Sequence, residues 1–213
     1  MINGTYSRDY RYLDEFFDSI LEDVGPTLIN SVHDYTSDTA INRINTVFPL
    51  SGKSILDVGC GIGRDIKKFE DLGANAIGIT VNEKEWLNQL GTSIFYSDQN
   101  FIYWSISGFD LVYASHVLEH SPIPLFTLLE YKRILNDDGL LYVEVPSDKP
   151  WAIHNQNHYS IFCKEMWKEL FNKAGFELVE ELNLQVLISE KKGEDPYIKD
   201  EFWGFLLKKK NVS

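Results

Sequence analysis

One stretch decides the fold of this 213-residue chain, and it reads Ile55-Leu56-Asp57-Val58-Gly59-Cys60-Gly61-Ile62-Gly63. It opens with a short apolar run, residues 54–58, which is typical of a buried β-strand. The glycines that follow permit a tight turn and a close approach of the backbone to a ligand. Residues 65–72 then have the pattern of a helix, whose N-terminal N–H groups are available to a bound group. The stretch therefore predicts a strand, a ligand-binding turn and a helix.

The same alternation continues along the chain. Further strands are predicted at residues 75–81, 93–96, 109–114 and 140–145, and helices at 83–90, 124–135 and 164–174, with a turn at 136–139. In the helix over 124–135 we expect the inward side chains to be Leu125, Leu128, Leu129 and Leu135. Buried strands that alternate with helices indicate a Rossmann-like α/β fold, with a mostly parallel sheet and helices on both faces. Two last strands, at 176–186 and 202–208, have no helix between them and should pair antiparallel at one edge.

Residues 1–50 differ from the rest, because they are rich in aromatic and polar side chains. Helical spacing of apolar residues occurs at 9–20 and, more weakly, at 37–47. We therefore expect two parts: an N-terminal helical lid or appendage over residues 1–50, and a core domain over residues 51–213.

Composition restricts the classes of partner. Twenty Lys and Arg residues against 32 Asp and Glu residues give a formal net charge of −12. Such a surface repels phosphate backbones, so nucleic acid is an improbable partner. No apolar run approaches the ~20 residues of a membrane span. Two cysteines, Cys60 and Cys163, cannot form a disulfide framework, which favours a reduced, cytoplasmic protein. Nothing in the sequence indicates an oligomeric state.

The glycine turn is compatible with two kinds of ligand. A dinucleotide-binding turn has a third glycine at the position that Arg64 occupies here. It also has to accommodate a pyrophosphate, which the carboxylate of Asp57 would repel. A cationic ligand suits Asp57 better, so the turn argues against an NAD(P)-dependent oxidoreductase without excluding it.

Four motifs together resemble those of class I S-adenosylmethionine-dependent methyltransferases, in particular the small-molecule branch that includes the ubiquinone-biosynthesis type. They lie at residues 55–63, at 109–120 (Phe-Asp-Leu-Val, then Ala-Ser-His-Val-Leu-Glu-His), at 133–141 and at 174–176. The resemblance covers roughly residues 51–185. It implies S-adenosylmethionine as cofactor, S-adenosylhomocysteine as product, and a seven-stranded sheet of order 3-2-1-4-5-7-6.

The resemblance also implies which residues line the cofactor. They follow the first four strands of the sheet: Asp57, Gly59, Cys60, Gly61 and Gly63; Thr80, Val81 and Asn82; Ser97, Asp98 and Gln99; Ser115 and His116. Thr80 stands where this family usually has an acid that holds both ribose hydroxyls, and a threonine offers one hydroxyl instead. Either Asn82 or Glu83 would then reach back to the ribose. A similar Gly-x-Thr pattern occurs in cyclopropane-fatty-acid-synthase-like methyltransferases.

Two histidines are candidates for a general base, His116 at the tip of the fourth strand and His158 in the loop after the fifth. Residues 116–120 also read His-x-x-Glu-His, an inverted zinc-protease motif that requires a helix. Here the motif follows a strand directly, and Pro122 and Pro124 come immediately after it. We therefore expect no metal site.

The resemblance implies transfer of a methyl group to a small-molecule acceptor, most simply a hydroxyl of a metabolite or sugar. The Asn/Asp-Pro-Pro-aromatic motif of methyltransferases that act on nucleic-acid base amines is absent, because residues 114–117 read Ala-Ser-His-Val. Two alternatives stay open: an NAD(P)-dependent oxidoreductase, and a module that binds S-adenosylmethionine without catalysis.

Overall fold

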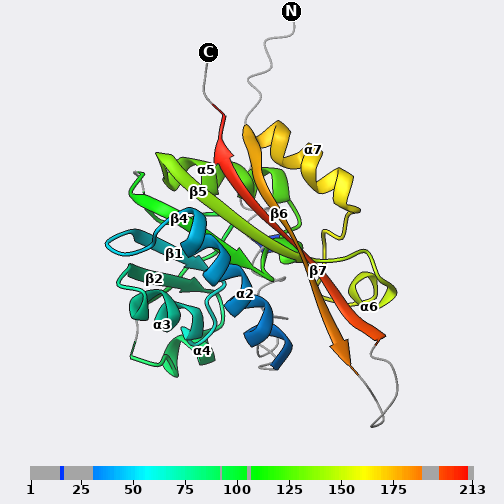
Figure 1. The fold of residues 1–213 in the computed structure, drawn as a ribbon, viewed down its shortest axis with the longest axis horizontal. Coiled ribbons are helices and arrows are strands. Elements are labelled where there is room, and N and C mark those ends of the chain that lie inside the picture. Colours follow the sequence, from blue (N-terminus) through cyan, green and yellow to red (C-terminus); the bar gives the residue numbers. More distant parts are fainter. Residues whose placement is uncertain (1–14, 17–30, 92, 105–106, 189–196, 211–213) are drawn as a thin grey trace, which may run out of the picture.

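The fold is a seven-stranded sheet with helices on both faces (Figure 1). The computed structural model describes residues 15–16, 31–91, 93–104, 107–188 and 197–210. The strands are β1 Ser54–Val58, β2 Asn75–Thr80, β3 Ile94–Tyr96, β4 Phe109–Ser115, β5 Leu135–Pro146, β6 Phe176–Ile188 and β7 Tyr197–Lys209. The helices are α2 Ser31–Val47, α3 Arg64–Asp71, α4 Glu83–Leu87, η1 Leu118–His120, α5 Pro124–Ile134, α6 Pro150–Ile153 and α7 Lys164–Ala174. The helix expected at 9–20 lies outside the described residues except for its positions 15 and 16.

The order of the strands is β3-β2-β1-β4-β5-β7-β6, which confirms the predicted topology. Strands β1 to β5 pair in parallel, whereas β7 pairs antiparallel with both β5 and β6. Figure 1 shows β6 and β7 side by side as a long hairpin that reaches past α6. Because β1 to β5 are parallel, their carboxyl ends meet at one edge of the sheet, where ligands bind in such folds.

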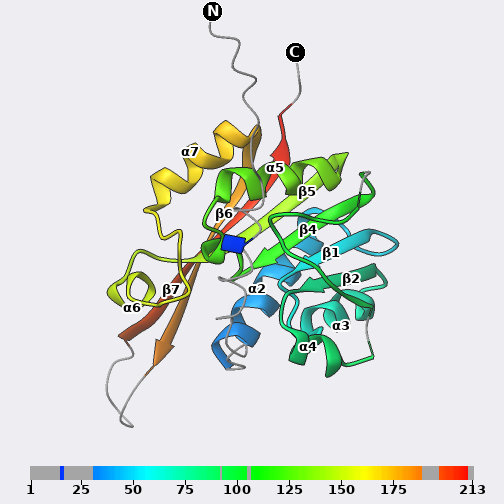
Figure 2. The same ribbon diagram turned by 180° about the vertical axis from the view of Figure 1, so that it is seen from behind.

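Two hydrophobic clusters cover the two faces of the sheet. One contains the inner faces of α5 and α7, including Leu128 and Trp167, and the other contains those of α2 and α3, including Ile44 and Phe69. Figures 1 and 2 show these helices from the two sides. Burying a large apolar side chain contributes roughly 1.5–3 kcal/mol, so both helix layers hold the sheet in place. Of the residues that were expected to form an appendage, those of α2 thus pack into the core.

Several local features differ from the sequence predictions. Residues 136–139 belong to β5, where the pairing shifts from Phe109 with Leu135 to Leu111 with Leu140. Neither α6 nor η1 was predicted, because each is too short to show a period. In α5, Leu128 is buried as expected, but Leu125 and Leu129 are 39% and 46% exposed.

The inward face of α5 is rotated because a polar residue occupies it. Thr127 is buried, and its hydroxyl lies 2.7 Å from the Ser121 hydroxyl and donates to Oδ1 of Asn100. Because these hydrogen bonds satisfy the Thr127 hydroxyl, its burial costs little free energy. The leucine pattern alone therefore predicted the wrong face.

Close packing of β2 against the glycine turn and α3 depends on Gly78. A Cβ atom at this position would lie 2.6 Å from both Cys60 Cβ and Ile66 Cδ1. We expect Gly78→Ala to lower the free energy of unfolding by about 1–3 kcal/mol through overpacking. The measurement is urea denaturation, with Gly108→Ala as the matched control, because nothing lies within 4 Å of a Cβ there. Equal stability of the two variants would contradict this account.

No helix in the described part of the chain is long and apolar enough to cross a membrane.

Candidate functional site

Backbone hydrogen bonds tie the ends of the first three strands together at the carboxyl edge. The N–H groups of Gly59 and Cys60 donate to the carbonyl of Ile79 over 2.9 and 3.0 Å. At the next strand, the N–H of Ser97 donates to the carbonyl of Thr80 over 3.0 Å. The segments that the sequence assigned to the cofactor therefore lie side by side.

The glycine turn needs its glycines. Gly59, Gly61 and Gly63 have φ angles of 70°, 54° and 91°, in the left-handed region that side chains disfavour. Gly59 has a second constraint, since a Cβ atom there would lie 2.7 Å from Cγ2 of Val117. The turn after β1 thus packs directly against the turn after β4.

Asp57 brings a buried carboxylate to the start of this turn. Its side chain is 3% exposed, and its Oδ2 atom has no hydrogen-bond partner. Burial raises the pKa of Asp57 well above its usual range, and the nearby Asp65 carboxylate raises it further, against the opposing effect of Lys68. Leaving a carboxylate oxygen in this state costs free energy, which a cationic ligand can recover.

At the end of β2, where this family usually has an acid, Thr80 is hydrogen-bonded to an acid from the following helix. The Thr80 hydroxyl donates to Oε2 of Glu85 over 3.1 Å and accepts from the N–H of Asn82. Asn82 caps α4 through its Oδ1 atom, which accepts from the N–H groups of Lys84 and Glu85. Val81, between Thr80 and Asn82 in the chain, is half-buried. A carboxylate therefore does lie at the tip of β2, but it comes from Glu85.

Glu83 is not that acid, because its side chain is exposed at the first turn of α4. The signal that points to Glu85 is the cap itself. An Asn at the N-cap begins the helix one residue later, so the third residue after it turns back toward the strand. The sequence analysis named Asn82 and Glu83 but missed Glu85.

Of the three residues after β3, one faces away from the edge. Both ends of the Gln99 amide are engaged inside the protein, because Nε2 donates to the Val117 carbonyl and Oε1 accepts from the Tyr131 hydroxyl. Asp98 accepts two hydrogen bonds from Asn100 through Oδ1 and closes a local turn. Burial raises the pKa of Asp98, which these bonds oppose. Ser97 and Asp98 stay predictions as adenine contacts, whereas the Gln99 side chain has a structural role.

His116 follows Ser115 at the tip of β4 and is paired with two buried carboxylates. Its Nε2 atom lies 2.8 Å from Oε1 of Glu144, and its Nδ1 atom lies 3.7 Å from Oε1 of Glu119. Burial alone would lower the pKa of His116, but the two carboxylates outweigh it and raise the pKa to about 10. This shift favours the imidazolium, the form that cannot accept a proton, and the role of His116 as a base stays a prediction.

The backbone at His116 is unusual too. Its φ of 53° is the single positive value for a non-glycine residue in the described ranges. Such strain persists where the surroundings fix it, and it occurs often at functional sites. The rings of His33 in α2 and Phe202 in β7 lie 4.6 and 4.7 Å away, measured between ring centroids.

Glu144 was missed by the sequence analysis. It lies in β5, is fully buried, and accepts a hydrogen bond of 2.9 Å from the Tyr142 hydroxyl through its other oxygen. A detectable signal exists, because Glu144 is a lone acid in the apolar run 140–145, and acids are almost never buried unless they are paired.

His158, the other predicted base, lies beside His120. The two ring centroids are 5.0 Å apart, and Nδ1 of His158 is 2.9 Å from the Ala152 carbonyl oxygen. Burial lowers the pKa of His158, against the charge of Glu119, so its imidazole is neutral at pH 7. His158 therefore has a ring nitrogen able to accept a proton, and its role as a base stays a prediction.

Comparison with known proteins gives the family of this chain. The sequence profile of the methyltransferase domain family matches residues 33–181. The ubiquinone biosynthesis O-methyltransferase of Thiobacillus denitrificans is 31% identical over 108 residues, covering 46% of this chain and 47% of that protein. The tRNA U34 carboxymethyltransferase of Pseudomonas savastanoi pv. phaseolicola is 28% identical over 183 residues, covering 71% and 55%. The chain thus spans about half the length of these curated relatives.

A solved structure shares the fold. The 1,6-didemethyltoxoflavin-N1-methyltransferase of Burkholderia thailandensis, solved with 1,6-didemethyltoxoflavin and S-adenosylhomocysteine bound, superposes with a TM-score of 0.67 at 17% identity, over 99% of this chain and 94% of that one. Sheet order, glycine turn and family profile all agree. The chain belongs to the methyltransferase domain family, in its class I branch, whose cofactor is S-adenosylmethionine.

Proposed function

We propose that this chain transfers the methyl group of S-adenosylmethionine to a small-molecule acceptor, at a hydroxyl oxygen. The observation that carries the proposal is the buried Oδ2 atom of Asp57, which has no hydrogen-bond partner and lies at the glycine turn. The ammonium group of the cofactor's methionine part would supply the positively charged hydrogen-bond donor that this carboxylate oxygen lacks. Methyl transfer from a sulfonium is an in-line displacement, so much of the rate enhancement comes from alignment of acceptor, methyl and sulfur.

The acceptor class rests on charge and on relatives. A net charge of −12 opposes a polyanionic acceptor. The ubiquinone biosynthesis relative is an O-methyltransferase by name, which supports an oxygen acceptor. The tRNA U34 carboxymethyltransferases match a longer part of this chain, so tRNA is the competing acceptor.

The experiment is calorimetric titration with S-adenosylhomocysteine, followed by turnover of S-adenosylmethionine against separate panels of hydroxylated aromatic compounds, sugars and bulk tRNA. Saturable binding together with turnover on a small hydroxylated compound supports the proposal. Turnover on tRNA alone would overturn the small-molecule acceptor and make tRNA the acceptor. Binding without turnover on any panel would favour a non-catalytic binding module, and binding of NAD⁺ alone would overturn the cofactor assignment.

We further propose that Glu85 holds the ribose hydroxyls of the cofactor, in place of the acid that this family usually has at the position of Thr80. Glu85→Gln is expected to weaken S-adenosylhomocysteine binding roughly 10- to 100-fold, because a charge-assisted hydrogen bond contributes about 1.5–3 kcal/mol. Calorimetry of the variant checks this. The matched control is Glu83→Gln, an exposed acid two residues earlier, which should bind like the parent. The same affinity in both variants would remove Glu85 from the cofactor site.

A further inference from the structure

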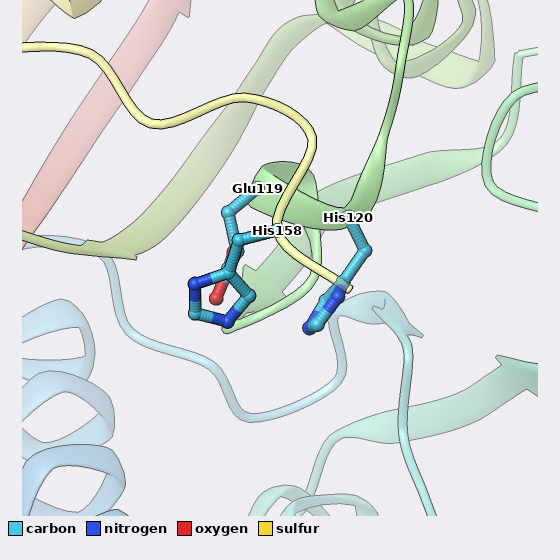
Figure 3. Close-up of side chains that lie close together, drawn as sticks. All are labelled: Glu119, His120 and His158. Carbon is cyan, nitrogen blue, oxygen red and sulfur yellow. The ribbon is translucent and has the colours of Figure 1, made fainter. Parts of the chain in front are cut away.

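Three potential metal ligands converge from separate segments of the chain. Glu119 and His120 belong to η1, and His158 follows α6, yet one donor atom from each lies within 4.8 Å of the others. Figure 3 shows the Glu119 carboxylate behind the His158 ring, with the His120 ring beside them. The sequence analysis expected no metal here because the His-x-x-Glu-His motif follows a strand directly and is followed by Pro122 and Pro124.

Both imidazole rings are oriented by backbone carbonyls. Nδ1 of His120 lies 2.7 Å from the Asn157 carbonyl oxygen, and Nδ1 of His158 lies 2.9 Å from that of Ala152. A carbonyl oxygen only accepts, so each Nδ1 atom carries the hydrogen. In the neutral ring the lone pair is then on Nε2, which is the arrangement that metal-binding histidines have in proteins.

The third ligand is a buried acid with an unused oxygen. Glu119 is 1% exposed, and its Oε2 atom has no hydrogen-bond partner, whereas Oε1 faces Nδ1 of His116 at 3.7 Å. An unpaired buried carboxylate oxygen is costly unless a cation or donor meets it. This observation is independent of the two rings and points to a ligand at the same place.

The segment that carries His158 is fixed against η1 by its backbone. The N–H groups of Tyr159 and Ser160 both donate to the Glu119 carbonyl over 2.9 Å, and the Ser160 hydroxyl donates to the Ser121 carbonyl over 2.6 Å. The three side chains are therefore held near one another without a bound ion. A preorganised set of ligands is what a specific metal site requires.

We propose that Glu119, His120 and His158 form a binding site for a divalent first-row transition-metal ion. One carboxylate oxygen and two imidazole nitrogens suit Zn²⁺ and Fe²⁺, and three protein ligands leave coordination positions open. Bonds of about 2.1 Å place the ligand atoms roughly 3–3.5 Å apart, so binding contracts the cluster by about 1 Å.

A role for the ion follows if the proposed methyl transfer holds. The cluster adjoins His116 at the tip of β4, which the resemblance places among the residues that line the cofactor. An acceptor oxygen at an open coordination position would have its hydroxyl pKa lowered by the ion. No other base is then required for an oxygen acceptor. Binding of the ion itself does not depend on this role.

The test uses the full chain, without an affinity tag, treated with chelator and then titrated with Zn²⁺ by calorimetry and with Co²⁺ by visible absorption. We expect one equivalent to bind, and we expect His120→Ala and His158→Ala each to weaken binding by at least about 100-fold. The matched control is His154→Ala, an exposed histidine four residues before His158, which should bind like the parent.

S-adenosylhomocysteine binding is measured on every variant. Retained cofactor binding shows that a variant folds, so a loss of metal affinity then belongs to the site. Should His158→Ala unfold, His158→Gln takes its place. Absence of stoichiometric binding by the parent, or binding unchanged in both ligand variants, would overturn the metal site. Loss of cofactor binding in the parent would instead overturn the proposed function.

Discussion

Replacing Glu144 with glutamine is expected to lower the free energy of unfolding by about 3–5 kcal/mol, because it removes one partner of a buried ion pair. The Glu144 side chain is fully buried, with Oε1 at 2.8 Å from Nε2 of His116. Glu144→Gln leaves the imidazolium of His116 with Glu119 alone at the longer distance of 3.7 Å. Chemical denaturation followed by circular dichroism measures the loss.

A triple variant separates charge from packing. His116→Gln combined with Glu144→Gln and Glu119→Gln removes the imidazolium together with both carboxylates that face it, so no buried charge is left without a partner. This variant should recover much of the stability, since an isolated buried charge costs more than a neutral set of the same shape. The matched control is Tyr142→Phe, which removes a single hydrogen bond to Glu144 and should cost only about 1–2 kcal/mol. A loss below 1 kcal/mol in Glu144→Gln would mean that His116 carries no charge in this pair.

Asp57→Asn is expected to act in opposite directions on binding and on stability. S-adenosylhomocysteine should bind roughly 10- to 100-fold more weakly, because an amide cannot replace a charge-assisted partner of the ligand ammonium. The free protein should gain about 1–3 kcal/mol, since a neutral amide replaces a buried carboxylate whose Oδ2 atom has no hydrogen-bond partner. Calorimetry gives the first quantity and denaturation the second.

The stability gain should depend on pH in a definite sense. Burial and then Asp65 raise the folded-state pKa of Asp57 above its unfolded value of about 3.9, with Lys68 opposing them. Between the two pKa values the folded state binds more protons, so parent stability falls as pH rises through this window. The advantage of Asp57→Asn is therefore absent near pH 3.5 and grows above it. An advantage that shrinks with rising pH would contradict the buried, unpaired carboxylate.

Much of the fold follows from the sequence. The apolar runs of β1 and β2 and the helical pattern of α7, each next to a glycine that ends or precedes the element, predicted these three elements within a residue of their observed bounds. The inner face of α5 did not follow, because burial of Thr127 depends on hydrogen bonds to Ser121 and Asn100. Tertiary partners of this kind leave no trace in local hydrophobicity.

For the site, the sequence predicted segments better than side chains. The glycine turn with Asp57 is local, and the resemblance located it. The acid at β2 comes instead from Glu85, since the N-cap of α4 turns it back toward Thr80. His158 lies beside η1 because the N–H groups of Tyr159 and Ser160 bond to the Glu119 carbonyl, about 40 residues away along the chain. Contacts between distant segments decide both cases.

The contact of Gly59 with Val117 has a consequence for attempts to alter this protein. Because Val117 fills the space that a Cβ atom at position 59 would need, the glycine turn and the turn that carries His116 are packed against each other. A larger side chain at position 117 would press on the glycine turn. A smaller one would leave that turn without its support. Any redesign of position 117 therefore has to treat the two turns as a single part.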